Sequence, residues 1–115
     1  MTALHGSANY RRALQHGERY SDHVLALRAL RRAEDETADG VRVGVTVGKR
    51  FGGAVQRNRF RRWLRASVRA ALRSPRGAWD LVFIPRSGAR TVTHDQLRAS
   101  VSRLVGRAGV SGHGE

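Results

Sequence analysis

Hydrophobic and polar positions alternate most regularly between residues 41 and 48. Every second position there is a valine, and the positions between the valines are polar or small. This period of two predicts a strand that places one face on a core. On the opposite face, Gly44 and Thr46 leave room for close packing or for the approach of a ligand.

Two further segments are predicted to be strands. Residues 23–32 alternate in part, which suits a strand with one face against a core. Residues 79–85 contain the continuous apolar run Leu81 to Ile84. A strand without alternation is typical of burial on both faces, so this one is expected inside the sheet.

Three other segments follow the helical period of about 3.6 residues. The first spans residues 7–17, with Ser7 as its N-cap and Gly17 at its end. The second begins at residue 54 and is expected to end near residue 74. The third is capped by Thr93 and reaches about residue 107.

The order of helices and strands predicts one domain of mixed α and β structure. A chain of 115 residues supports a single modest core. We place a single domain at residues 1–107 and a flexible tail at 108–115, which is rich in Gly and Ser. The acidic stretch 33–40 is predicted to be an exposed loop between two strands.

The net charge of the chain is strongly positive and points to a class of partner. The formal net charge is +13, and the basic residues are 21 arginines and the single lysine Lys49. Self-repulsion on this scale destabilises a small domain, so a polyanionic partner is expected, either nucleic acid or a membrane surface. Arginine suits bidentate phosphate recognition, although codon usage in a GC-rich genome explains the same bias equally well.

Several classes of protein are disfavoured by composition. The chain has no cysteine, and its longest apolar runs are far too short to span a bilayer. No secretory signal is evident, so a soluble cytoplasmic protein is expected. The five histidines are scattered, and neither a metal cluster nor a catalytic Ser-His-Asp arrangement can be argued.

Positive charge is concentrated between residues 49 and 76, which hold ten basic residues and no acid. On a helical wheel, Phe60, Trp63 and Leu64 share the apolar half. The polar half carries Asn58, Arg61, Arg62, Arg65, Arg69 and Arg73. Arginines spaced by four residues repel one another, and a phosphate backbone would offset this repulsion by releasing counterions. A solvated face is the simpler alternative; a membrane-surface helix would need apolar residues free for lipid.

The run from Val43 to Arg65 carries the motif Arg57-Asn58-Arg59, followed by Arg61, Arg62 and Arg65. This run resembles the bacterial ribonuclease P protein component. Two flanking matches support the resemblance: residues 10–14 with Gly17, and residues 80–86. The resemblance covers residues 4 to 106 in order and spacing.

The resemblance implies an α+β fold: a two-layer α/β sandwich similar to domain 2 of ribosomal protein S5, in the order αβββαβα, with the basic helix at its centre. It also implies a protein subunit of the ribonuclease P ribonucleoprotein. In that family the RNA subunit is the catalyst and removes the 5′ leader of precursor tRNA by endonucleolytic cleavage with Mg²⁺. The implied partners are ribonuclease P RNA and precursor tRNA, with no membrane and no protein partner.

Site residues follow from the same resemblance. The residues expected to contact the catalytic RNA are Lys49, Arg50, Arg57, Asn58, Arg59, Arg61, Arg62, Arg65 and Arg69. The residues expected to line a leader-binding cleft are Tyr10, Arg11, Leu14 and Arg28. Leu14 and Arg28 stand where the family often has aromatic residues, so leader binding is expected to depend less on stacking and more on charge. No catalytic or metal-binding residue is assigned to the protein.

Two alternatives share part of this pattern. A structural RNA-binding protein of ribosomal type would have the same charge but no need for a leader cleft. A stand-alone nuclease would need a catalytic cluster, for which the sequence offers no candidate.

Overall fold

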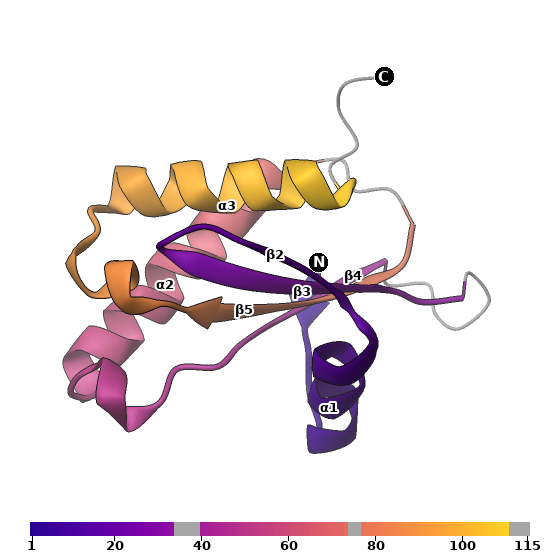
Figure 1. Ribbon diagram of the computed structural model, residues 1–115, viewed down its shortest axis with the longest axis horizontal. Coiled ribbons are helices and arrows are strands. Elements are labelled where there is room, and N and C mark those ends of the chain that lie inside the picture. Colours follow the sequence, from indigo (N-terminus) through magenta and orange to yellow (C-terminus); the bar gives the residue numbers. More distant parts are fainter. Residues whose placement is uncertain (34–39, 74–76, 111–115) are drawn as a thin grey trace.

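The computed structural model describes residues 1–33, 40–73 and 77–110 (Figure 1). Within these ranges one sheet is built from β1 (Thr2–Ala3), β2 (Glu18–Ser21), β3 (Leu25–Arg31), β4 (Val41–Val45) and β5 (Trp79–Pro85). The strands lie in the order β1-β4-β5-β3-β2. β1, β4 and β5 are parallel to one another, whereas β3 is antiparallel to both β5 and β2.

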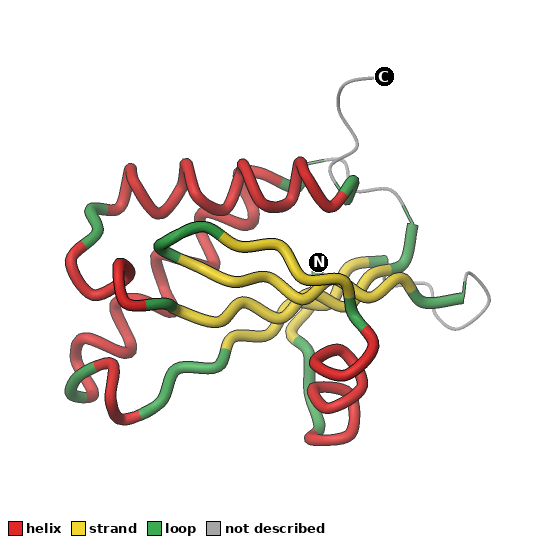
Figure 2. Tube along the Cα trace, in the orientation of Figure 1, coloured by secondary structure: helices red, strands yellow, loops and turns green. Residues whose placement is uncertain are grey.

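Three helices and two short 3₁₀ turns connect the strands. The helices are α1 (Ser7–His16), α2 (Ala54–Ala71) and α3 (His94–Ala108), and the turns are η1 (Lys49–Phe51) and η2 (Ser87–Thr91). Figure 1 shows α2 and α3 on one side of the sheet and α1 on the other. The same arrangement appears in Figure 2. The predicted α+β fold is confirmed, with α1 added on the face that a two-layer sandwich leaves uncovered.

The predicted strand at residues 79–85 is confirmed as β5, which lies between β4 and β3. Leu81, Val82 and Phe83 are fully buried, as a strand covered on both faces requires. The strand predicted at 41–48 ends earlier, at Val45. β1 and β2 were not predicted from periodicity because one is very short and the other carries mostly polar residues.

The main core lies between the sheet and the pair α2 and α3. Its buried residues are Val24, Leu25, Leu27, Ala29, Val41, Val47, Phe60, Leu64, Val68, Leu72, Leu81, Phe83, Ala89, Leu97, Val101, Leu104, Val105 and Val110. A smaller cluster of Leu4, Ala13 and Val82 lies under α1. Hydrophobic burial is therefore uneven between the two faces of the sheet.

The first turn of α1 corrects one prediction. Ser7 is the first helical residue rather than the N-cap, and the cap is Gly6, which adopts a φ of 90°. Only glycine adopts this conformation readily, which explains why the chain turns there. At the other end, Gly17 is the predicted C-cap. A Cβ at Gly17 would lie 2.5 Å from the Ala13 carbonyl oxygen, so the absence of a side chain allows the close contact.

The ends of the other helices differ slightly from the prediction. Thr93 caps α3 as expected, and it does so through a capping box with Gln96. α2 ends at Ala71, short of the predicted residue 74. α3 continues to Ala108, one residue beyond the predicted end, and Val110 is fully buried. Residues 34–39 of the expected acidic loop and residues 111–115 lie outside the described ranges.

Asp22 links the turn between β2 and β3 to α3 through hydrogen bonds. Its carboxylate accepts hydrogen bonds from the backbone N–H groups of Val24 and Leu25, both at 2.9 Å. It also accepts from the Ser100 hydroxyl at 2.8 Å and the Arg103 guanidinium at 2.7 Å. Burial raises the pKa of Asp22, but these four donors outweigh it and lower the pKa to about 2.

Candidate nucleic-acid interface

Tyr10 lies directly against the backbone of β4. A Cβ added at Gly44 would lie only 2.4 Å from the Tyr10 Oη and 2.6 Å from its Cζ, so the aromatic ring occupies the space that a side chain would need. The small residue predicted to permit close packing therefore accommodates a side chain of α1. The contact holds the half-buried Tyr10 ring at the edge of an open groove.

This groove, of about 330 Å³, runs between residues 1–4, β4 and α2. We refer to it as the Tyr10 groove. Tyr10 lines one side of it, Gly44 belongs to its floor, and α2 lines the other side with Arg61, Arg65 and Arg69. No acidic residue is among the described residues that line it. The structure thus brings an aromatic ring predicted for leader binding together with three arginines predicted for the catalytic RNA.

The arginines of α2 have little internal compensation. Arg62, Arg65 and Arg69 are exposed, and the first turn of the helix carries no acid. The Arg57 Nε atom is buried without a hydrogen-bond partner among the described residues. An unsatisfied buried donor costs about 1–3 kcal/mol, which a phosphate oxygen reaching it would recover. In the same turn Arg61 donates to the Asn58 Oδ1 atom over 3.4 Å, a long hydrogen bond.

Other residues predicted to contact the catalytic RNA lie elsewhere. Arg59 is on a different side of α2, with its Cζ atom 5.2 Å from the centre of the Trp63 ring. Lys49 and Arg50 are exposed in η1. Arg50 lines a separate hollow together with Arg86 from the end of β5. The predicted set is therefore divided among at least two surfaces.

The predicted leader cleft is also divided. Only Tyr10 of its four residues lines the Tyr10 groove. Leu14 packs on the small cluster under α1, and Arg11 is exposed on the same helix. Arg28 lies beyond the other end of α1, where its guanidinium donates to the Gly17 carbonyl at 3.0 Å. Neither Leu14 nor Arg28 adds an aromatic ring to the groove.

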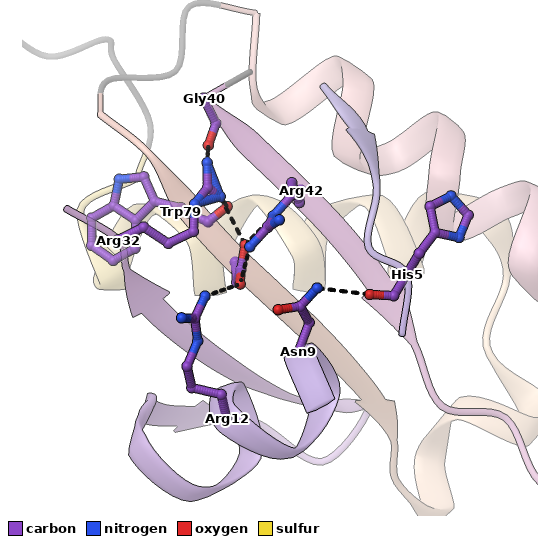
Figure 3. A network of polar contacts seen from close by, with 8 residues as sticks. His5, Asn9, Arg12, Arg32, Gly40, Arg42 and Trp79 are labelled. Carbon is purple, nitrogen blue, oxygen red and sulfur yellow. Dashed lines mark hydrogen bonds and ion pairs between the residues drawn. The ribbon is translucent and has the colours of Figure 1, made fainter. Parts of the chain in front are cut away.

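Beneath α1, the buried carboxylate of Asp80 holds a network that the sequence did not reveal (Figure 3). Asp80 accepts two hydrogen bonds from Arg42, at 2.7 and 2.8 Å, and one from Arg32 at 2.8 Å. Arg12 of α1 reaches the same carboxylate at 3.5 Å. Arg32 also donates to the Gly40 carbonyl at 2.7 Å.

The Asp80 network joins four segments of the chain. Its arginines come from α1, from the residue after β3 and from β4, and the carboxylate comes from β5. Asp80 looked isolated in the sequence, because only the sheet register places it beside Arg42. The bidentate contact with Arg42 is geometrically specific and joins β4 to β5, whereas α1 reaches the network through the longer Arg12 contact.

Within residues 1–33, 40–73 and 77–110, no group of three or more His, Cys, Asp or Glu side chains could hold a metal ion. No helix in the same ranges is long and apolar enough to cross a bilayer.

Comparison with known proteins decides the family. The family model described as Ribonuclease P matches residues 2–109. The chain belongs to the ribonuclease P protein family. It is 35% identical over 105 residues to the ribonuclease P protein component of Herpetosiphon aurantiacus, covering 91% of this chain and 82% of that protein. It is 39% identical over 106 residues to the component from Gluconacetobacter diazotrophicus, covering 91% and 89%.

Solved structures agree. The ribonuclease P protein of Staphylococcus aureus superposes with a TM-score of 0.82 at 25% identity and covers 94% of this chain and 95% of that chain. The protein from Thermotoga maritima has the same fold, with a TM-score of 0.77 at 21% identity over 91% and 96% of the two chains. The predicted family and fold are confirmed: the chain is a protein subunit of ribonuclease P, an endoribonuclease made of RNA and protein.

Proposed function

We propose that this subunit binds the 5′ leader of precursor tRNA in the Tyr10 groove and binds ribonuclease P RNA through the remaining arginines of α2 and η1. The observation that carries the proposal is that Tyr10 lines one groove together with Arg61, Arg65 and Arg69, with no acidic residue among the described residues of its lining. Proteins that bind single-stranded RNA combine these two elements: cations that follow the backbone and an aromatic ring on which a base stacks.

The groove supports one stacked base rather than several. Tyr10 is its aromatic residue, whereas Leu14 is packed under α1 and Arg28 is bonded to the Gly17 carbonyl. We therefore expect the leader to be held by one stacking contact and by phosphate contacts to the three arginines. Affinity should then fall steeply as salt concentration rises.

Catalysis belongs to the RNA subunit in this proposal. The described part of the protein offers no carboxylate cluster that fits Mg²⁺, and its most buried carboxylate, Asp80, is surrounded by guanidinium groups. We therefore assign the magnesium ions to the RNA. The protein contributes by binding the leader and the catalytic RNA at the same time, which orients the substrate.

Reconstitution tests this function. The protein is mixed with a bacterial ribonuclease P RNA and precursor tRNA at low Mg²⁺ concentration, and removal of the leader is followed. We expect the protein to stimulate cleavage and to cleave nothing without the RNA. Failure to stimulate would overturn the proposal, and cleavage by the protein alone would favour a stand-alone nuclease.

The docking face has its own test. Replacing Arg50, Arg57 and Arg62 together by Ala, three arginines of η1 and α2 outside the Tyr10 groove, should weaken binding to ribonuclease P RNA. The salt dependence should fall by about two to three phosphate contacts. Arg98, exposed on α3, provides a control for the loss of one arginine outside the proposed surfaces. An unchanged salt dependence in the triple variant would exclude these arginines from docking on ribonuclease P RNA.

A further inference from the structure

A second hollow lies on the side of α2 that carries Arg59. We refer to this hollow, of about 190 Å³ between η1, α2 and η2, as the Trp63 pocket. The described residues that the argument uses are Phe51, Gln56, Arg59, Trp63 and Arg90. None of them lines the Tyr10 groove, so the two hollows are separate sites on the same helix.

The wall of the Trp63 pocket is aromatic and already ordered. Phe51 packs on Phe60 with ring centres 4.8 Å apart and planes tilted by 50°. Trp63 is stacked on His94 at 5.1 Å with planes only 6° apart. The Arg59 guanidinium also lies over the Trp63 ring, with its Cζ atom 5.2 Å from the ring centre. A flat ligand would therefore meet a preformed wall of aromatic rings and one guanidinium plane.

The rim of the same pocket is cationic. Arg59 and Arg90 are both exposed, one on α2 and the other in η2, and no acidic residue is among the described lining residues. The exposed Gln56 adds an amide that can both donate and accept hydrogen bonds. Pockets for drug-sized ligands are usually larger, about 300–1,000 Å³, so this volume suits a single small planar group.

We propose that the Trp63 pocket binds one unstacked nucleotide of ribonuclease P RNA. Its base lies against the aromatic wall, its edge meets Gln56, and its phosphate contacts Arg90. This inference rests on the proposed function, because it assumes that α2 docks on that RNA. The RNA subunit is favoured over the leader because the pocket and the Tyr10 groove lie on different sides of α2.

The first test compares single arginine variants of the full chain, using transcribed ribonuclease P RNA as the probe. Arg90→Ala should weaken binding by about 5- to 20-fold and lower the salt dependence by about one phosphate contact. Arg98→Ala, the matched control, should change binding less than twofold. Circular dichroism and thermal unfolding should show that both exposed substitutions leave the fold intact.

The second test uses the emission of Trp63. The chain has two tryptophans, so Trp79→Phe leaves Trp63 as the single reporter. Saturating ribonuclease P RNA should quench this emission, and adding Arg90→Ala should abolish most of the quenching at equal occupancy. Emission that does not respond to the RNA would overturn the inference.

The outcomes separate the two proposals. If Arg62→Ala weakens binding of ribonuclease P RNA but Arg90→Ala behaves like Arg98→Ala, the proposed function stands and the Trp63 pocket is excluded. If neither Arg62→Ala nor Arg90→Ala weakens that binding, the proposed docking of ribonuclease P RNA on α2 is wrong. If Arg90→Ala weakens binding of precursor tRNA and leaves ribonuclease P RNA unaffected, the pocket serves the leader and the inference fails.

Discussion

The two faces of the sheet are built differently. The face under α2 and α3 is covered by a continuous apolar core that includes Phe83 and Leu104. The face under α1 has only a small apolar cluster, the Asp80 network and the open Tyr10 groove. One face therefore supplies most of the hydrophobic stability, and the other combines ionic bonds with an accessible surface.

This difference shows how a small domain can keep a groove open beside its sheet. α1 is short and packs mainly on β3 and β5, and beside Tyr10 residues 43–45 of β4 line the open groove. The cost of incomplete apolar burial there is offset by the core on the opposite face. The Asp80 ion pairs add little net stability because their groups are desolvated, but removing one partner leaves the other charge buried and unpaired. Substitutions on the two faces should accordingly separate stability from binding.

The largest effect on stability is expected for Phe83→Ala, on the face under α2 and α3. Phe83 is fully buried in the centre of the sheet. Removing its ring should lower the free energy of unfolding by about 4 kcal/mol, measured by urea denaturation. RNA affinity per folded molecule should not change. If the free energy of unfolding fell by less than about 1 kcal/mol, the core on this face would not be the main source of stability.

Asp80→Asn should have the next largest effect, from the opposite face. The substitution removes the charge that balances the buried Arg32 guanidinium, and its expected cost is about 3 kcal/mol. Asp95→Asn is the matched control, because Asp95 is exposed in the first turn of α3. If both variants lose the same free energy of unfolding, the network does not hold this face together.

Asp22 predicts a pH dependence on the side of α3. The pKa of Asp22 is about 2 in the folded protein, compared with 3.8 for an aspartate outside the folded structure, so the folded state favours the carboxylate. This preference contributes about 2 kcal/mol, which is fully present above pH 3.8 and is lost as pH falls through about 2.

Urea denaturation from pH 5 to pH 2 measures that contribution. The difference in stability between the wild type and Asp22→Asn should shrink across this window, because the wild type becomes neutral at the same site. A difference that stays constant down to pH 2 would mean that the hydrogen bonds to Asp22 do not depend on its charge.

The smallest effect on stability is expected for Gly44→Ala. The new Cβ would collide with the outer atoms of the Tyr10 ring, which can rotate away. Stability should fall by no more than about 1 kcal/mol. Precursor tRNA affinity should fall several-fold, measured by filter binding with mature tRNA as control. Unchanged precursor affinity would show that the position of Tyr10 is unimportant.

The sequence predicted the elements with strong patterns. β5 and the N-terminus of α3 lie where the apolar run and Thr93 placed them, and the capping box with Gln96 was seen only in the structure. The sequence predicted close packing or ligand approach at Gly44 because the residue is small. Only the folded structure shows that the packing partner is Tyr10. β2 was missed because four mostly polar residues carry no reliable period.

The site was less predictable because it depends on which distant segments meet. A single helical wheel does not show that Arg59 faces η2 while Arg65 faces the start of α1. Asp80 and Arg42 become partners only through the register of β4 and β5. The sequence around Arg90 does not mark it as a site residue, because the residues that line the same pocket lie about thirty positions away in the chain.

The leader-dependent affinity of Tyr10→Ala tests the central claim most directly. The reconstituted ribonucleoprotein, with wild-type or variant protein, is titrated with precursor tRNA and with mature tRNA under the same salt conditions. Loss of one stacked base should weaken precursor binding by about 1–3 kcal/mol and leave mature tRNA binding unchanged. Equal loss for both substrates, or no loss for the precursor, would show that the Tyr10 groove does not bind the leader.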